Sequence, residues 1–265
     1  MHSSESFLIL RPFNALFFLI FAAFLLLLAG AGLLLRHKSA RVKKTVIVVS
    51  CALTFVGFFL YKYALSIDAE YDALTAAMGG FNWWGELPLH LCNVNMLLIP
   101  AAVLSEKRPL LSFCFFVGPL GAALALFMPG NGFSGFSILL PRMLGYFGTH
   151  FMIVIMALSL ATFGFYKPRF RDIPAAALTL AGVALAAFGI SMLFRATGLY
   201  PGANYFYTVE TEGNPLLELF YGWIPVPCLY LLPGIAVLGI YASLATLIYR
   251  GIDLLRNGMG KKSAA

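Results

Sequence analysis

The chain is a succession of long apolar blocks separated by short polar segments. Most blocks hold roughly twenty residues with few charges, the length that a helix needs to cross about 30 Å of hydrocarbon. Lipid offers the backbone no hydrogen-bond partners, so the blocks should be helical. The pattern predicts an all-α, polytopic transmembrane bundle of about seven helices, forming one domain over residues 1–265. The predicted spans are 14–35, 45–67, 86–104, 109–127, 144–166, 174–194 and 224–249.

Basic residues are distributed unevenly between the two sides of this arrangement. Fourteen of the 18 lysine and arginine residues fall in the first, third and fifth loops and in the carboxyl-terminal tail. Cytoplasmic segments carry such an excess, so we expect the amino terminus outside and the carboxyl terminus in the cytoplasm. A multi-pass protein of the cell (plasma) membrane is the expected location.

Two outer loops are longer than the topology requires. Residues 68–85 end in Phe81, Trp83 and Trp84, which suit the aromatic belt at a membrane surface. Residues 195–223 contain no apolar block long enough to span and should fold over the outer face. No β-sheet is expected in the membrane, and only these two loops could contain a hairpin.

Composition agrees with a membrane class. Apolar residues make up 61% of the chain and charged residues 11%, against about 25% in ordinary soluble domains. The basic segments on the predicted cytoplasmic side explain the net charge of +7, so nucleic acid is not an expected partner. Membrane lipids are the expected partners. The four cysteines lie in predicted spans and lack a C-x-x-C pair, which disfavours a structural zinc site.

Polar residues inside the spans are the candidates for function, because they are costly in hydrocarbon and usually face the bundle interior. His90 and His150 lie about one and a half turns below the outer surface in the third and fifth predicted spans. Asn93 shares the helical face of His90, whereas Cys92 lies about 160° away on a regular helix. No cofactor is expected. A metal site formed by Glu86, His90 and His150 is disfavoured because it lacks a third histidine.

Arg142, Tyr146 and His150 follow one another at intervals of four residues and predict a polar stripe on one helix face. An arginine above an imidazole suits a phosphate head group or a carboxylate. Simpler interpretations stay open: the histidines could bond neighbouring helices, Arg142 could extend to the membrane surface, and Cys92 could only pack. Glu86 could be a charge favoured at a helix start.

Four segments resemble a known family. The segment Leu87-Pro-Leu-His-Leu-Cys92 is similar to the Pro-Leu-His-Leu-Cys signature of the YwaF-type family of bacterial integral membrane proteins. The segments Tyr146-Phe-Gly-Thr-His150, Gly202-Ala-Asn-Tyr205 and Trp223-Ile-Pro225 resemble its fifth helix, its Gly-x-Asn-Tyr loop and the entry to its last helix. The last segment departs from the usual Trp-Pro by an inserted isoleucine.

A eukaryotic transmembrane family that acylates ether phospholipids is more distantly similar. Its Pro-Cys-His motif implies a cysteine nucleophile, but Leu89 stands at that position, so the nucleophile does not carry over. Cys92 could replace it if the helix is irregular near Pro88 or if His150 activates the thiol.

Three hypotheses follow for the function. In the first, a membrane-embedded lipid acyltransferase or hydrolase uses His90 or His150 as base, with Cys92 or water as nucleophile, while Glu86, Asn93, Arg142, Tyr146, Asn204 and Tyr205 bind substrate. In the second, a permease or binding protein uses the same residues for a lipid or small molecule without bond chemistry. In the third, the chain is a structural membrane partner. The relative position of the two histidine rings bears most directly on this choice.

Overall fold

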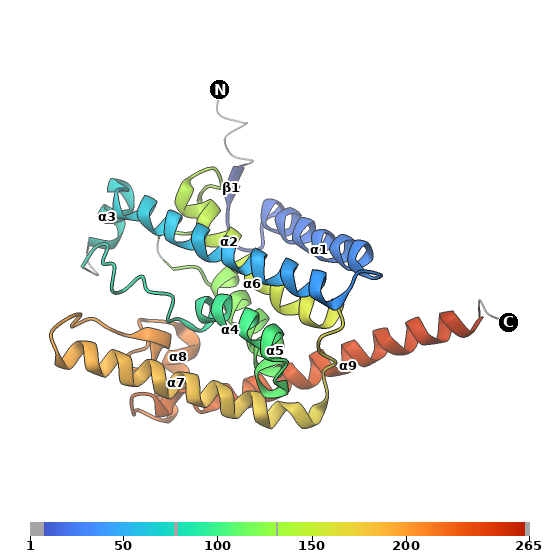
Figure 1. Ribbon diagram of the computed structural model, residues 1–265. Helices are drawn as coiled ribbons and strands as arrows, with labels where there is room; N and C mark the ends of the chain where they lie inside the picture. The colour runs from blue at the N-terminus through green and yellow to red at the C-terminus, as the bar shows by residue number, and fades with distance from the viewer. Residues whose placement is uncertain (1–7, 77–78, 131, 263–265) are drawn as a thin grey trace.

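The computed structural model describes residues 8–76, 79–130 and 132–262, and most of this part of the chain is helical. Six of its helices are long and apolar enough to cross a membrane, and α4 is a shorter apolar helix. The predicted bundle of about seven helices is therefore confirmed (Figure 1). The helices are α1 (Ala15–Leu35), α2 (Ala40–Ser66), α3 (Ala69–Thr75), α4 (Leu91–Ser105), α5 (Arg108–Phe127), α6 (Pro141–Thr162), α7 (Ile173–Ala196), α8 (Pro215–Trp223) and α9 (Pro233–Lys262), with short 3₁₀ turns η3 (Phe170–Asp172), η4 (Tyr205–Tyr207) and η5 (Leu229–Leu231).

Helices α5 and α6 form the centre of the bundle. Most of their residues are buried, whereas the other long helices expose most of their length, as expected where lipid is the solvent. Helix α6 packs against α1, α2, α4 and α5, and α5 packs against α4, α6, α7 and α9. The carboxyl-terminal half of α9 extends away from the bundle (Figure 1).

Capping residues set the starts of the first two helices. The side-chain oxygen of Asn14 accepts a hydrogen bond from the backbone N–H of Phe17 at 2.9 Å, at the predicted start of the first span. The hydroxyl of Ser39 caps α2, which begins at Ala40 and not at residue 45 as hydropathy predicts. Hydropathy misses this first turn because its basic side chains can reach water while its backbone stays helical.

The third span differs most from its prediction. Helix α4 begins at Leu91 and not at residue 86, and His90 is its N-cap residue with an extended backbone. Pro88 disfavours the helical conformation of Leu87, so the preceding residues form turns. The expected shared helical face of His90 and Asn93 is therefore wrong. The last span also begins later than predicted, at η5 and α9, because Pro225, Pro227 and Pro233 interrupt the helix.

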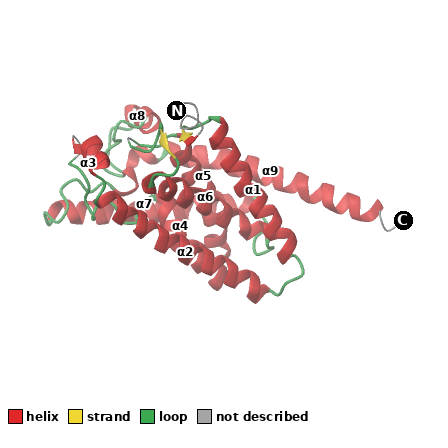
Figure 2. Cartoon of the chain, turned by 90° about the horizontal axis from the view of Figure 1, so that it is seen from above, coloured by secondary structure: helices red, strands yellow, loops and turns green. Residues whose placement is uncertain are grey.

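A small β-ladder is the other departure. Strand β1 (Ile9–Leu10) pairs antiparallel with β2 (Phe136–Ser137), in neither of the two loops expected to hold a hairpin (Figure 2). The ladder ties the segment before α1 to the loop between α5 and α6. It lies at the predicted outer end of the bundle and contains two residues per strand, so it does not span a membrane.

Candidate functional site

His150 is held in a defined tautomer inside the bundle. Its Nδ1 lies 2.7 Å from the backbone carbonyl oxygen of Tyr146, one turn earlier on α6. A carbonyl oxygen only accepts hydrogen bonds, so in the neutral ring Nδ1 carries the proton and Nε2 keeps a basic lone pair. The side chain is buried at 4% exposure, and the Tyr146 ring packs against it at 4.4 Å between centroids. The phenol of Tyr146 donates in turn to the carbonyl of Ala125 at 2.8 Å.

His90 lies where α4 meets the long outer loop. Its ring centroid lies 5.5 Å from that of Tyr207 and 6.2 Å from that of Tyr205. It also lies within the range of a long electrostatic interaction with His150. The structure therefore brings the two predicted histidines into one region, although α4 does not carry His90 on its face.

An ion pair between Lys62 and Glu86 stands beside the histidines. Lys62 comes from the outer half of α2, Glu86 comes from the turns before α4, and the Lys62 side chain is 9% exposed. The electrostatic influence of Lys62 reaches His90, Cys92 and His150. Lys62 was not among the residues predicted for the site, although its position as the single cation inside a predicted span was a signal.

Cys92 and Asn93 occupy the first turn of α4. The Cys92 thiol donates to the side-chain oxygen of Asn93 at 3.7 Å, and Asn93 is buried. Cys92 is close enough to Tyr61, Tyr146 and Tyr207 to influence them electrostatically. The thiol thus belongs to the same cluster as the two histidines.

Arg142 is engaged in ion pairs. Its guanidinium, 1% exposed, donates to Asp68 at 2.7 Å and to Glu70 at 2.6 Å, and it lies over the Phe136 ring. Burial by itself would raise the pKa of Asp68, but hydrogen bonds from the Tyr71 backbone and from Arg142 outweigh it and hold that pKa below its ordinary value. Both terminal nitrogens of the guanidinium, which was predicted to suit a phosphate head group or a carboxylate, are therefore paired with carboxylates that fasten α3 to α6.

Asn204 organises the outer loop. Its amide donates to the Glu210 carbonyl at 2.8 Å and to the Glu212 carboxylate at 2.7 Å, and its oxygen accepts from the backbone of Val209 and Glu210. Burial raises the pKa of Glu212, and the Asn204 amide partly opposes this shift. Both the nitrogen and the oxygen of the Asn204 side-chain amide are thus engaged within the loop.

Tyr205 and Tyr207 bring this loop onto the site. The Tyr205 backbone N–H donates to the Ser191 hydroxyl on α7 at 2.9 Å, and the Tyr205 phenol donates to the carbonyl of Trp84. Burial, reinforced by the charges of Glu212 and Cys92, raises the pKa of Tyr207 to about 12. Tyr207 is therefore a protonated hydrogen-bond donor at neutral pH, and it joins the site although it was not among the residues predicted for it.

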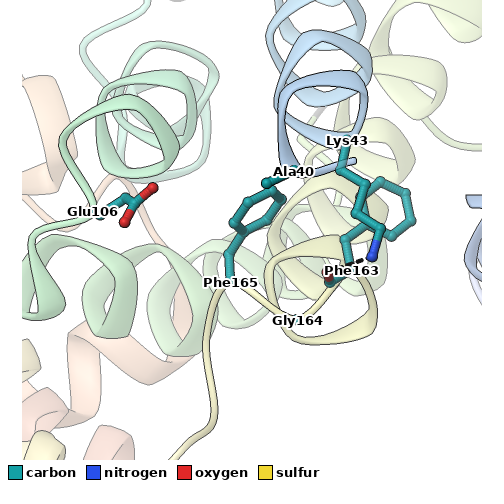
Figure 3. A pocket seen from close by; sticks show the side chains of 6 residues that line it. All are labelled: Ala40, Lys43, Glu106, Phe163, Gly164 and Phe165. Carbon is teal, nitrogen blue, oxygen red and sulfur yellow. Dashed lines mark hydrogen bonds between the residues drawn. The ribbon is translucent and has the colours of Figure 1, made fainter. Parts of the chain in front are cut away.

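Two cavities lie outside this cluster. A cavity of about 270 Å³ at the predicted cytoplasmic end is lined by Ala40, Lys43, Glu106 and residues 163–165, and Lys43 donates to the Phe163 carbonyl there (Figure 3). A groove of about 570 Å³ runs between α2 and α6. Neither is lined by His90 or His150. Within the described ranges, no group of three His, Cys, Asp or Glu residues is arranged to hold a metal ion.

One comparison with known proteins identifies a family. Residues 4–244, nearly the whole chain, match the model of the TMEM164 family, so the chain belongs to that family. No curated protein and no solved structure matches the chain. The match and the apolar helices establish a multi-pass integral membrane protein. The narrower YwaF-type resemblance stays a prediction.

Proposed function

We propose that this member of the TMEM164 family is a membrane-embedded enzyme that transfers or hydrolyses the acyl chains of lipids. The observation that carries the proposal is the hydrogen bond from Nδ1 of His150 to the Tyr146 carbonyl, because it leaves Nε2 as a general base in a site largely shielded from water. The resemblance to ether-phospholipid acyltransferases supports the same chemistry. We expect the protein to act in the cell (plasma) membrane, on its lipids.

In the proposed reaction His150 acts first as general base and then as general acid. Nε2 takes the proton of an attacking hydroxyl group, which belongs to an acceptor lipid in transfer and to water in hydrolysis. The oxygen then bonds to the ester carbonyl carbon and forms a tetrahedral intermediate. Collapse breaks the bond to the original alcohol, and the imidazolium returns the proton to that leaving oxygen.

Cys92 offers a second route through the same base. Nε2 then takes the proton of the thiol, the thiolate accepts the acyl group as a thioester, and the first alcohol leaves with the proton. In a second step the acceptor alcohol or water, deprotonated by the same base, releases the acyl group and restores the thiol.

Two hydrogen-bond donors beside the histidines support such a reaction. The ammonium of Lys62 and the phenol of Tyr207 are donors beside the histidines, suited to the negative charge that develops on the ester oxygen. A lysine and a glutamate near membrane depth are costly to retain, which favours a role beyond packing. Glu86, predicted to bind substrate, is instead assigned here as the ion-pair partner that holds Lys62 in place.

The test is turnover of phospholipids by the purified protein in lipid nanodiscs, followed by lipid mass spectrometry. His150→Ala should lower turnover by about 10²–10⁴-fold, the usual contribution of a general base. His37→Ala, in the exposed predicted cytoplasmic loop, is the matched control and should leave turnover unchanged. Cys92→Ser should abolish turnover only in the thioester route.

Two results would contradict the proposal. Wild-type protein that yields no changed lipid but binds one, with affinity lost in His150→Ala, would indicate a binding protein or permease. Variants of His90 and His150 that lose only thermal stability would indicate that both rings pack between helices.

A further inference from the structure

An open groove runs between α2 and α6 on the lipid-facing surface of the bundle. Its volume of about 570 Å³ lies within the range of about 300–1,000 Å³ typical of small-molecule sites. Apolar side chains and glycines make up most of its wall, and the Thr54 hydroxyl in it donates to the Ser50 carbonyl of its own helix. The residues that line it are Ser50, Leu53, Thr54, Gly57, Leu60, Tyr61 and Ala64 of α2, and Pro141, Leu144, Gly145, Gly148, Thr149 and Met152 of α6.

Glycines create the space. A Cβ atom at Gly57 or Gly148 would meet no heavy atom within 4 Å, so both positions open onto the groove. At Gly145 the opposite holds, because an added Cβ would lie 2.1 Å from the Cβ of Tyr61. The two helices therefore approach closely at Gly145 and leave a channel beside that contact.

We propose that this groove holds a single acyl chain of a membrane lipid, with its ester end at Tyr61. The inference rests on the proposed function and names the way in which the substrate reaches the site, sideways from the bilayer between α2 and α6. The occupant is a lipid chain because the groove opens to hydrocarbon along the membrane-spanning part of both helices.

The length of the groove fits one chain. Its lining covers fourteen helical steps on α2, from Ser50 to Ala64, which correspond to about 21 Å. On α6 it covers eleven steps, from Pro141 to Met152, or about 16 Å. One leaflet of a bilayer contributes about 15 Å of hydrocarbon, so a groove of this length takes a single extended chain of one leaflet.

Tyr61 connects the groove to the polar cluster. It lines the groove, the ammonium of Lys62 lies 4.7 Å from its ring centre, and it is close enough to Glu86 and Cys92 to interact electrostatically. The side chain is 5% exposed, and among the described residues its hydroxyl has no hydrogen-bond partner. A nearly buried phenol without a partner is suited to donate to an ester oxygen.

The direction of the groove also agrees with a lipid of the predicted outer leaflet. Tyr61, Ala64 and Pro141 lie near the outer ends of their helices, whereas Ser50 and Met152 lie deeper. An outer-leaflet lipid has the same direction, with its ester near the surface and its chain running inward. A chain in the groove would thus place its ester at Tyr61, on the side of the groove nearest Glu86 and Cys92.

Photolabelling tests the inference directly. The probe is a phosphatidylcholine with a diazirine in the middle of one acyl chain, incorporated into nanodiscs with the full chain and mapped by peptide mass spectrometry. Labels should concentrate on residues 50–64 and 141–152 relative to lipid-facing α7. Gly148→Leu should lower this labelling by roughly tenfold, the effect of 1.4 kcal/mol of lost affinity.

Matched variants separate the groove from general lipid contact. Gly57→Leu fills the groove from the α2 side and should lower the labelling as Gly148→Leu does. Monodisperse elution shows which variants fold, and one folded variant of the two is sufficient for the test. Gly182→Leu on α7 adds the same side chain where a Cβ also meets nothing within 4 Å, and it should leave the labelling unchanged. His150→Ala should stop turnover and keep the labelling.

The outcomes distinguish the two proposals. Labels spread evenly over α2, α6 and α7, or labels unaffected by both leucine variants, would overturn the groove even if turnover is observed. Labelling confined to the groove in a wild-type protein without turnover would support the groove as a lipid-binding site and overturn the proposed catalysis.

Discussion

Removing Arg142 and removing its two carboxylate partners should destabilise the protein to different extents, although both changes delete the same ion pairs. The Arg142 side chain is 1% exposed, whereas the side chains of Asp68 and Glu70 are 25% and 58% exposed. In Arg142→Met the carboxylates can turn to water, so the loss is about 1–2 kcal/mol. In Asp68→Asn/Glu70→Gln an almost fully buried guanidinium loses its counter-charges, which costs about 3–5 kcal/mol.

Thermal unfolding in detergent, followed by tryptophan fluorescence, measures this difference. With about 2–4 °C per kcal/mol for a chain of this size, Tm should fall by roughly 4 °C in Arg142→Met and by roughly 12 °C in the double variant. Asparagine at position 68 can keep the cap that Asp68 forms with the backbone of Glu70 and Tyr71. The comparison therefore isolates the charges.

A control and a refuting result complete the experiment. Glu106→Gln removes the partner of Lys44 from a pair in which the Glu106 side chain is 64% exposed, and it should cost less than about 1 kcal/mol. Equal losses of Tm in Arg142→Met and in Asp68→Asn/Glu70→Gln, or a larger loss in Arg142→Met, would refute the reasoning. They would show that an unpaired Arg142 guanidinium is not the main source of the destabilisation.

Three further predictions follow from the same contacts. Gly145→Ala should cost about 1–3 kcal/mol because its Cβ would collide with Tyr61, whereas Gly148→Ala should be neutral or stabilise by up to about 1 kcal/mol; Tm of the pair checks this. Asn204→Ala should cost about 1–3 kcal/mol because half-buried backbone groups of Val209 and Glu210 lose their partner, and limited proteolysis of residues 204–212 should become faster. Because the native pKa of Asp68 lies below its unfolded value near 3.9, its contribution is present above that value and is lost as pH falls through the native pKa; wild-type Tm should therefore decline below about pH 4 more steeply than that of Arg142→Met.

The residue types of the candidate site were predictable from the sequence. Polar residues at membrane depth are few, so His90 and His150 could be selected from the sequence, and their common region needed only the helical rise and the side of entry. The partner of each residue was not predictable. Arg142 looked available for a phosphate, yet its two carboxylates come from the loop around α3, and no local pattern specifies that contact.

What the sequence by itself determined is the class of the protein. Apolar blocks of membrane length permit only helices in lipid, so the number and approximate limits of the spans follow from hydropathy. The tertiary structure decided how the helices meet. The close approach of α2 to Gly145 left the groove beside that contact, and the hydrogen bond from Tyr205 to Trp84 holds the outer loop over the site. These outcomes depend on contacts between residues far apart in the chain, whose energies no periodic pattern records.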